Sequence, residues 1–355
     1  MKIDFQPVRS LALIVLITML TVLGGILNPN AATAATYYVA TTGNDSNPGT
    51  QSKPFRTITK GMKALKAGDV LYVRSGTYEQ IYSGAQTIPT GTSWANAPRI
   101  AAYPGETVTI PGIGLTASYI KYVIFNGFII DGKGSTREGV YISKGAHHVR
   151  IQNCEIKNAS IHGILIPKES GGFNEFISVD IHHNGTRGHY HQGVYISSSN
   201  NIVQDSKVHH NAAYGIHIYN SGYSSANNNI VRNNKIYENG TLPGTSYGIL
   251  LASGKGNIAH NNLIYNNKGG VVIDSTAVDT QLYSNTIYSN APGYGIAVNP
   301  GSTRAVVRDN IVYDNPIRDS GVGTVYYNND TTNRKLVNGL ANSTTAPKAL
   351  RIVSP

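Results

Sequence analysis

A glycine followed by a short apolar phrase recurs through the middle of the 355-residue chain. The phrase reads Gly-Val-Tyr-Ile-Ser at its clearest, and its copies begin at Gly139, Gly163, Gly193, Gly215, Gly248, Gly270 and Gly295. These glycines lie 22 to 33 residues apart. Self-similarity at such a period is the signature of a solenoid, whose repeats bury their apolar faces only by stacking. Equivalent residues of successive repeats therefore form columns along the stack.

A second phrase, which ends in asparagine, alternates with the first at residues 151–158, 177–184, 202–211, 230–239, 258–267, 282–290 and 306–315. We interpret each repeat as a coil with two recognisable strands. Strand alternation predicts one inward column of Ile156, Ile181, Val208, Ile236, Ile264, Ile287 and Val312. Two positions earlier, Asn234, Asn262, Asn285 and Asn310 are predicted to form a ladder of amides that bond from coil to coil.

The region before the repeats has a different character. Residues 37–40, 70–74, 99–103 and 107–110 read as strands, and residues 43–50 as a turn-rich loop. Phe55, Ile58, Met62 and Leu65 recur at helical spacing, which predicts a short amphipathic helix over residues 57–66. Such a helix would cover the open edge of the first coil, which is otherwise a template for aggregation.

Two segments of this region carry a family resemblance. TYYVATTGNDSNPGTQSKPFRTITKGMKALKAGDVLYVRSGTY (residues 36–78) and PRIAAYPGETVTI (residues 98–110) resemble the N-terminal region of secreted right-handed parallel β-helix proteins of the pectate-lyase-like superfamily. The resemblance spans roughly residues 36–330. It implies an all-β fold, a right-handed parallel β-helix of about eight to ten coils with a short N-terminal capping helix. The superfamily includes polysaccharide lyases, uronan epimerases, glycoside hydrolases and non-catalytic members, so it does not define an activity.

Four segments follow along the chain: a signal peptide (1–35), the cap and first coils (36–110), the β-helix repeats (111–330) and a C-terminal tail (331–355). Lys2 and Arg9 precede an apolar run at residues 11–27, and Ala32-Thr33-Ala34 has the small residues of a cleavage site. That run is short for a membrane span, so we favour cleavage near Ala34 or Ala35 over a permanent anchor. The mature protein is then expected to be secreted, periplasmic or on the cell surface, with no stable membrane insertion.

The composition constrains the partner. The formal net charge is +10, and Cys154 is the only cysteine, so no intramolecular disulfide can form. A basic, exported, repetitive protein suits an anionic polysaccharide, although the charge could equally serve solubility alone. We expect no nucleic-acid partner, because no basic cluster or nucleic-acid motif is present, and we expect a monomer.

The coils of unusual length predict where a ligand binds. Outward positions of the middle repeats carry Tyr195, His217 and Tyr219. Extra residues lengthen the turns on both sides of this face, at residues 185–192 and 240–247 on one side and 168–174 and 221–227 on the other. Insertions gathered on one face of a solenoid often mark its binding face. We therefore predict a groove with these three side chains on its floor.

Lyase chemistry on a uronic-acid polymer needs a group that neutralises the carboxylate, a base for the C5 proton and an acid for the leaving oxygen. We assign the catalytic roles to His191, Tyr195 and His217, with either histidine as the base and Tyr195 as the acid or a platform for the sugar. The predicted substrate-binding residues are His162, Lys168, Arg187, His189, Tyr190, Tyr219 and Tyr223. Arg187 and Lys168 would bind carboxylates, and Phe173 would line the same wall as Lys168.

Other interpretations stay open. His189, His191 and His217 could bind zinc or copper, but we predict no metal site because no third ligand is fixed; calcium remains an open cofactor, without the aspartate cluster that pectate lyases use. The pairs His182-His183 and His209-His210 occupy columns that hold Tyr237-Glu238 elsewhere, so we expect a structural role for them. A glycoside hydrolase needs two facing carboxylates, and acids are sparse here. The leading prediction is a polysaccharide lyase; a hydrolase or a non-catalytic carbohydrate-binding or matrix protein are the alternatives.

Overall fold

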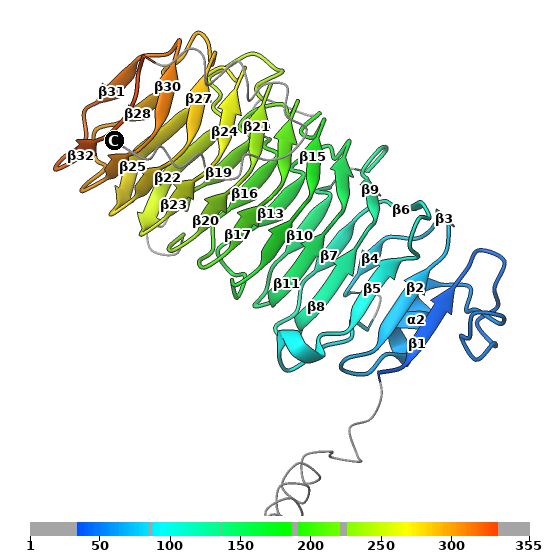
Figure 1. Cartoon of the computed structure of the whole chain (residues 1–355). Helices are drawn as coiled ribbons and strands as arrows, with labels where there is room; N and C mark the ends of the chain where they lie inside the picture. Colours follow the sequence, from blue (N-terminus) through cyan, green and yellow to red (C-terminus); the bar gives the residue numbers. More distant parts are fainter. Residues whose placement is uncertain (1–33, 85–86, 136, 187–190, 221–225, 333–355) are drawn as a thin grey trace, which may run out of the picture. The chain divides into compact units, whose positions relative to one another are not determined.

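The computed structural model describes residues 34–84, 87–135, 137–186, 191–220 and 226–332. The predicted signal peptide, apart from its last two residues, and nearly all of the predicted tail lie outside these residues. From Ala35 onward the chain forms one compact unit, a stack of parallel coils (Figure 1). No helix within the described ranges is long and apolar enough to cross a membrane.

Three parallel sheets run along the stack, and the chain visits them in the same order in every coil. Sheet A has twelve strands: β1 (Thr36–Val39), β2 (Val70–Val73), β5 (Arg99–Ala102), β8 (Lys121–Asn126), β11 (His147–Gln152), β14 (Glu175–Ile177), β17 (Ile202–Gln204), β20 (Ile230–Arg232), β23 (Ile258–His260), β26 (Gln281–Tyr283), β29 (Val306–Arg308) and β32 (Val325–Tyr327). Sheet B has ten: β3 (Gly76–Thr77), β6 (Val108–Ile110), β9 (Ile129–Asp131), β12 (Glu155–Lys157), β15 (Asp180–His182), β18 (Lys207–His209), β21 (Lys235–Tyr237), β24 (Leu263–Tyr265), β27 (Thr286–Tyr288) and β30 (Ile311–Tyr313).

Sheet C contains the glycine phrase. Its ten strands are β4 (Ile81–Tyr82), β7 (Ile113–Leu115), β10 (Val140–Ile142), β13 (Ile164–Ile166), β16 (Val194–Ile196), β19 (Ile216–Ile218), β22 (Ile249–Lys255), β25 (Val271–Val278), β28 (Ile296–Val298) and β31 (Ile317–Asp319). The described residues therefore contain ten full coils, β2 to β31, at the upper end of the predicted number. The right-handed parallel β-helix is confirmed.

Each coil has three strands, so the interpretation of two strands per coil was wrong. The asparagine phrase is divided by a single residue in the left-handed conformation, for example Asn153 (φ 52°) between β11 and β12. One such residue turns the chain from sheet A to sheet B and shifts the apolar alternation by only one position, because Ile151 before it and Cys154 after it are both buried. The sequence pattern alone therefore reads two short strands as one.

The core is one continuous cluster that runs along the inside of the three sheets. All seven residues of the predicted inward column, from Ile156 to Val312, are buried. The recurring glycine is needed because neighbouring coils approach closely at that point. A Cβ added to Gly215 would lie 2.6 Å from the carbonyl oxygen of Gly248 and 2.9 Å from Ile236 Cγ2.

The predicted asparagine ladder is confirmed. The Nδ2 of Asn234 donates to Asn262 Oδ1 at 3.0 Å, and the same bond repeats through Asn285 to Asn310. Two further ladders were not predicted. One follows sheet B and contains Asn184, Asn211, Asn239, Asn267 and Asn290; the other precedes sheet A and contains Asn174, Asn201, Asn229 and Asn257. Buried amides thus satisfy backbone groups at the turns of each coil.

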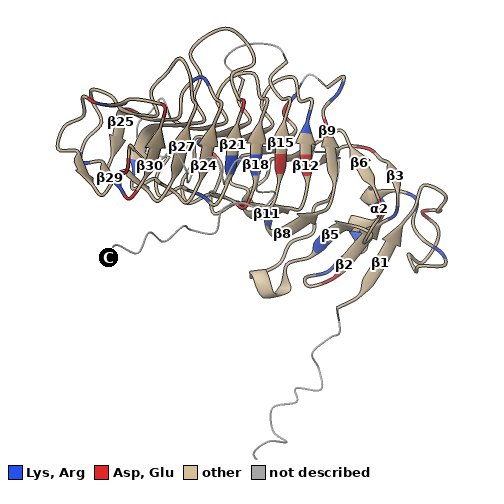
Figure 2. Ribbon diagram, turned by 45° about the horizontal axis from the view of Figure 1, so that its top comes forward, with Lys and Arg blue, Asp and Glu red and all other residues tan. Residues whose placement is uncertain are grey.

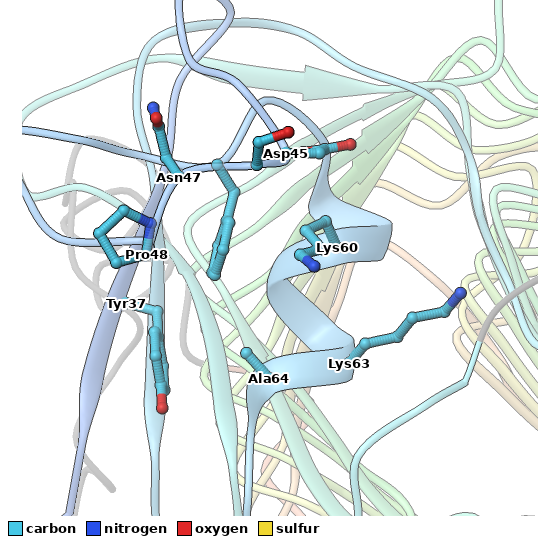
Figure 3. Close-up of a pocket in the computed structure, with 9 residues that line it drawn as sticks. Tyr37, Asp45, Asn47, Pro48, Lys60, Lys63 and Ala64 are labelled. Carbon is cyan, nitrogen blue, oxygen red and sulfur yellow. The ribbon is translucent and has the colours of Figure 1, made fainter.

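The predicted cap helix is present as α2 (Ile58–Ala64), with Thr57 as its N-cap. The helix packs on β1 and β2, where Gly61 is so close that an added Cβ would lie 2.6 Å from Leu71. Asp45 of the preceding loop accepts hydrogen bonds from the backbone of Arg56 and Thr57. A hollow of about 340 Å³ lies beside this helix (Figure 3). Because Asp45 already anchors the loop to the start of α2, we regard the hollow as a product of the cap's architecture.

Candidate functional site

The outer face of sheet C brings the predicted floor residues together. Tyr195 of β16 pairs directly with His217 of β19, and their rings stack at a centroid distance of 4.9 Å and an angle of 14°. Tyr219, which follows β19, stacks on His217 at 5.5 Å and 10°. Cross-strand aromatic pairs of this kind stabilise a sheet face in addition to any role in binding.

Two histidines lie at the edge of this floor. The ring of His162, just before β13, lies 5.3 Å from Tyr195 and 5.5 Å from His191. The backbone N–H of Gln192 donates to His162 Nδ1 at 3.1 Å, which fixes the imidazole with that nitrogen as the acceptor. Five predicted residues therefore form one contiguous group, the groove cluster: His162, His191, Tyr195, His217 and Tyr219.

The other predicted residues are not part of this cluster. Lys168 is exposed in the turn after β13, and no contact with the cluster is recorded for it among the described residues. Arg187, His189, Tyr190 and Tyr223 lie outside the described residues. The assignment of Phe173 to the groove wall was wrong, because its ring stacks on His148 beside sheet A at 4.9 Å.

A column that the sequence interpretation missed borders the floor. It is formed by the residue that immediately precedes the recurring glycine. In four of the coils this residue is Gln192, Tyr214, Tyr247 and Tyr294. Tyr214 lies 5.0 Å from His217, and Tyr247 stacks on Tyr214 at 5.9 Å and 8°. His162 occupies the same offset, so comparing that offset across the repeats would have found these residues.

Beyond His217, the outward side chains of sheet C are covered by other residues. Leu250, Ala252, Val272 and Ala297 point outward from the later strands of sheet C, as alternation predicts. All four are nevertheless buried, because tyrosines that include Tyr214, Tyr247 and Tyr294 pack over them. The groove cluster therefore lies where the open part of the face meets a surface covered by tyrosines.

Burial shifts the pKa of three members of the cluster toward their uncharged forms. It lowers the pKa of His162 to about 3, with a smaller contribution from the charge of His191. Burial, aided by His162, likewise lowers the pKa of His217 to about 3. Burial also raises the pKa of Tyr195, although the hydroxyl of Ser197 partly offsets this effect. At neutral pH the His162 and His217 imidazoles and the Tyr195 phenol are therefore uncharged.

These shifts predict a pH dependence of stability. The pKa of His162 and His217 is about 6.5 in the unfolded chain and about 3 in the fold, so protons bind the unfolded chain preferentially. Their contribution is complete above pH about 6.5 and is lost as pH falls toward about 3, by up to about 1.4 kcal/mol per pH unit for each histidine. We expect His217→Gln to flatten this dependence in urea unfolding measured across the range. Other histidines with lowered pKa titrate in the same range, so the slope of unfolding free energy against pH should decrease without disappearing. An unchanged slope in the variant would contradict the assignment.

The described residues offer no evident metal site. No group of three or more His, Cys, Asp or Glu side chains among them is placed to hold an ion. Calcium prefers six to eight oxygen ligands, whereas the groove cluster presents imidazole nitrogens and phenols. The side chains of this cluster therefore do not fit calcium.

The double histidines lie at sheet B and not on the outer face of sheet C. His182 bonds to Glu155 at 3.0 Å, and His209 bonds to Asp180 at 2.9 Å. His209 also stacks on Tyr237 at 4.6 Å, in the register that the repeats predict. In Figure 2 the ribbon is red at the acidic residues of β12 and β15 and blue at the basic residues of β18 and β21. These interactions join successive coils.

Comparison with known proteins agrees with this architecture. A family model described as a Pel9A-like right-handed β-helix region matches residues 37–190, and a model of a right-handed β-helix region matches residues 169–338. The structure of pectate lyase Pel9A superposes with a TM-score of 0.64 at 18% identity, covering 91% of this chain and 90% of that one. At this identity the likeness shows the fold alone.

Two sequence relatives match in part. Pectate lyase PEL9 of Emericella nidulans is 29% identical over 177 residues, which is 49% of this chain and 38% of the relative. YwoF of Bacillus subtilis, described as uncharacterized, is 25% identical over 141 residues, or 34% of this chain and 28% of that protein. The chain thus matches less than two fifths of the length of either relative. Together with the two family models and the fold, these matches identify the chain as a right-handed parallel β-helix protein of the pectate-lyase-like superfamily.

Proposed function

We propose that this protein is a polysaccharide lyase that cleaves a uronic-acid polymer at the groove cluster. The observation that carries the proposal is the stacked pair of Tyr195 and His217, which places a neutral phenol beside a neutral imidazole on an outer sheet face. The partial match to pectate lyase PEL9 supports the same substrate class.

Elimination has three requirements at this pair. The base takes the C5 proton, the electrons of that C–H bond form the C4=C5 double bond, and the C4–O bond breaks with a proton passing to the leaving oxygen. We assign the base to His217 and the acid to Tyr195, whose raised pKa keeps its proton available. His191 is the alternative base, since it lies across His162 from Tyr195.

The low pKa of His217 makes the reaction depend on an anionic substrate. A base whose conjugate acid has a pKa of about 3 is unprotonated at neutral pH but accepts a proton weakly. A uronate carboxylate within about 4–6 Å would raise that pKa by stabilising the imidazolium. The substrate would then activate the base that attacks it. Lys168 and Arg187 remain our proposed carboxylate ligands.

We further propose that the chain is exported and works as a monomer on an acidic polysaccharide. The net charge of +10 favours an anionic polymer. The apolar run at residues 11–27 and the small residues at 32–34 favour export.

The test is an assay for unsaturated products. Purified protein is incubated with polygalacturonate and with alginate, each with added calcium and with EDTA, and ultraviolet absorbance of the C4=C5 bond is followed. We expect absorbance to rise on at least one polymer and to be lost in His217→Ala. No rise on either polymer, with binding intact in gel retardation, would reject the lyase and support a non-catalytic binder.

The non-catalytic alternative has an observation of its own. Both His162 and His217 are held neutral by burial, and the stacked rings form an aromatic surface against which the C–H groups of a sugar can pack. A binding groove needs no proton transfer. In that case, replacing Tyr195 with phenylalanine would leave polymer binding unchanged and there would be no turnover to measure.

A further inference from the structure

One column of the solenoid consists of residues in the left-handed backbone conformation, and its first three members are aromatic. Just before or within the start of each sheet A strand from β8 onward, one residue per coil adopts the left-handed conformation, and backbone bonds place these residues in one register. From the fourth member onward the column contains Asn200, Asn228, Gly256, Asp279, Arg304 and Gly323. Five of these six are asparagine, aspartate or glycine, which tolerate this conformation well, and Arg304 is the exception. The first three members are instead Tyr122, His148 and Phe173, with φ of 47°, 51° and 54°.

These three rings form a stack along the solenoid. The rings of Tyr122 and His148 lie 4.5 Å apart, and those of His148 and Phe173 lie 4.9 Å apart with an angle of only 12°. We call Tyr122, His148 and Phe173 the ring column. At its first end the edge of Trp94, in the short helix η1 (Trp94–Asn96), meets Tyr122 at 5.5 Å and 86°. This end is therefore closed.

The other end of the column is open. Phe173 is 48% exposed, and the next coil supplies Asn200 at the same position and no ring. Neighbouring coils are spaced about 4.8 Å apart, which is also the spacing at which flat rings stack. A flat ligand ring could therefore lie on the outer face of Phe173, above the coil of Asn200, and continue the column.

The surroundings of Phe173 favour a sugar over a protein or a lipid. Lys168, Glu169 and Gly171 of the same turn are exposed, so the apolar surface is about one ring wide. A stable protein interface buries far more surface than this. A pyranose matches it, because one face of the ring carries C–H groups and its rim carries hydroxyls that the amide of Asn200 can bond.

We propose that the open end of the ring column at Phe173 is a second glycan-binding site that stacks one pyranose ring of a polysaccharide. The left-handed backbone conformation, which is unfavourable for bulky residues such as Tyr122 and Phe173, is then maintained for binding, as strained residues at functional sites often are. The site lies in the turn that leads to sheet A and shares none of its residues with the groove cluster. It does not depend on the chain being a lyase.

The decisive variant is Phe173→Asn, which places in the column the residue that the next coil uses. We expect its thermal midpoint to be equal to or above that of the parent, and its affinity for polygalacturonate or xylan in gel retardation to fall roughly tenfold. Phe173→Tyr keeps the ring and should bind like the parent. Phe173→Leu keeps apolar bulk without an aromatic face and should bind like the asparagine variant, which tests the idea even if Phe173→Asn folds poorly.

Two controls separate this site from its surroundings. All Phe173 variants are also made in the His217→Ala background. There, binding at the groove cluster is weakened, so the remaining polymer affinity reports on the site at Phe173. Trp94 is the chain's only tryptophan, so unchanged emission shows that the closed end of the column is intact. Unchanged binding of both polymers by Phe173→Asn with a lowered midpoint would overturn the proposal, leaving a purely structural stack. A concentration-dependent dimer that Phe173→Asn abolishes would overturn it in favour of self-association.

Discussion

Replacing Asn267 with alanine should lower the free energy of unfolding by about 3 to 5 kcal/mol. The amide of Asn267 accepts from the backbone and side chain of Asn239, and it donates to the carbonyls of Ile236 and Tyr265 and to Asn290. Alanine removes these five hydrogen bonds together. Asn290 Oδ1 keeps its bond from the backbone N–H of residue 267, and the Asn239 amide keeps Val208 and Tyr237, but the backbone N–H of Asn239 loses its bond to the side chain. A buried group left unpaired costs about 1–3 kcal/mol, and each bond lost elsewhere about 0.5–1.5 kcal/mol. Urea unfolding followed by circular dichroism measures the change.

The adjacent residue provides a matched control. Asn266 is exposed and adopts the left-handed conformation (φ 54°), so Asn266→Gly preserves the backbone and removes only a solvated amide. We expect this change to lower the free energy of unfolding by less than about 1 kcal/mol. If the two variants were equally stable, an amide of the ladder would contribute no more to stability than an exposed amide. The stability of the solenoid would then have to come from the apolar core alone.

Replacing Tyr195 with phenylalanine should reduce turnover on the cleaved polymer by about 10²- to 10⁴-fold, the usual contribution of a general acid. Only the hydroxyl is lost, so the stack on His217 and the apolar contact with a sugar are retained. KM should therefore change little while kcat falls, which separates proton donation from binding. Initial rates of unsaturated product at several polymer concentrations give both constants.

Tyr283 supplies the comparison for that experiment. It stacks on His260 at 4.7 Å on sheet A, in the same kind of cross-coil ring pair. Tyr283→Phe should leave both kinetic constants unchanged. A rise in KM with unchanged kcat in Tyr195→Phe would mean that the phenol hydroxyl only binds the sugar, and the acid would have to be sought elsewhere.

The fold could be predicted from the sequence because a solenoid repeats its constraints. The glycine at Gly215 is required by close contact with Gly248, and the same contact recurs in other coils, so the pattern is visible without a structure. The third strand of each coil was missed for a local reason. A single left-handed residue such as Asn153 changes the direction of the chain and shifts the alternation of apolar side chains by only one position, from Ile151 to Cys154.

The candidate site was predicted less completely. Alternation along a strand placed Tyr195 and His217 on one outer face, and direct pairing of β16 with β19 brought them together. Tyr214 was missed because it precedes its strand, where alternation makes no statement about direction. Phe173 was misplaced because the direction of a turn residue depends on its backbone conformation, and at φ 54° the ring is carried onto His148.

The three asparagine ladders also give the solenoid a dipole along its axis. In every recorded amide pair, the Nδ2 of one coil donates to the Oδ1 of the next coil toward the C-terminus, as in Asn211 to Asn239 and Asn201 to Asn229. The side-chain dipoles therefore add head to tail instead of cancelling, as peptide dipoles do in an α-helix. Each amide polarises its neighbour, which strengthens the bonds cooperatively. The fold thus contains three parallel lines of aligned dipoles with their positive ends toward the last coils.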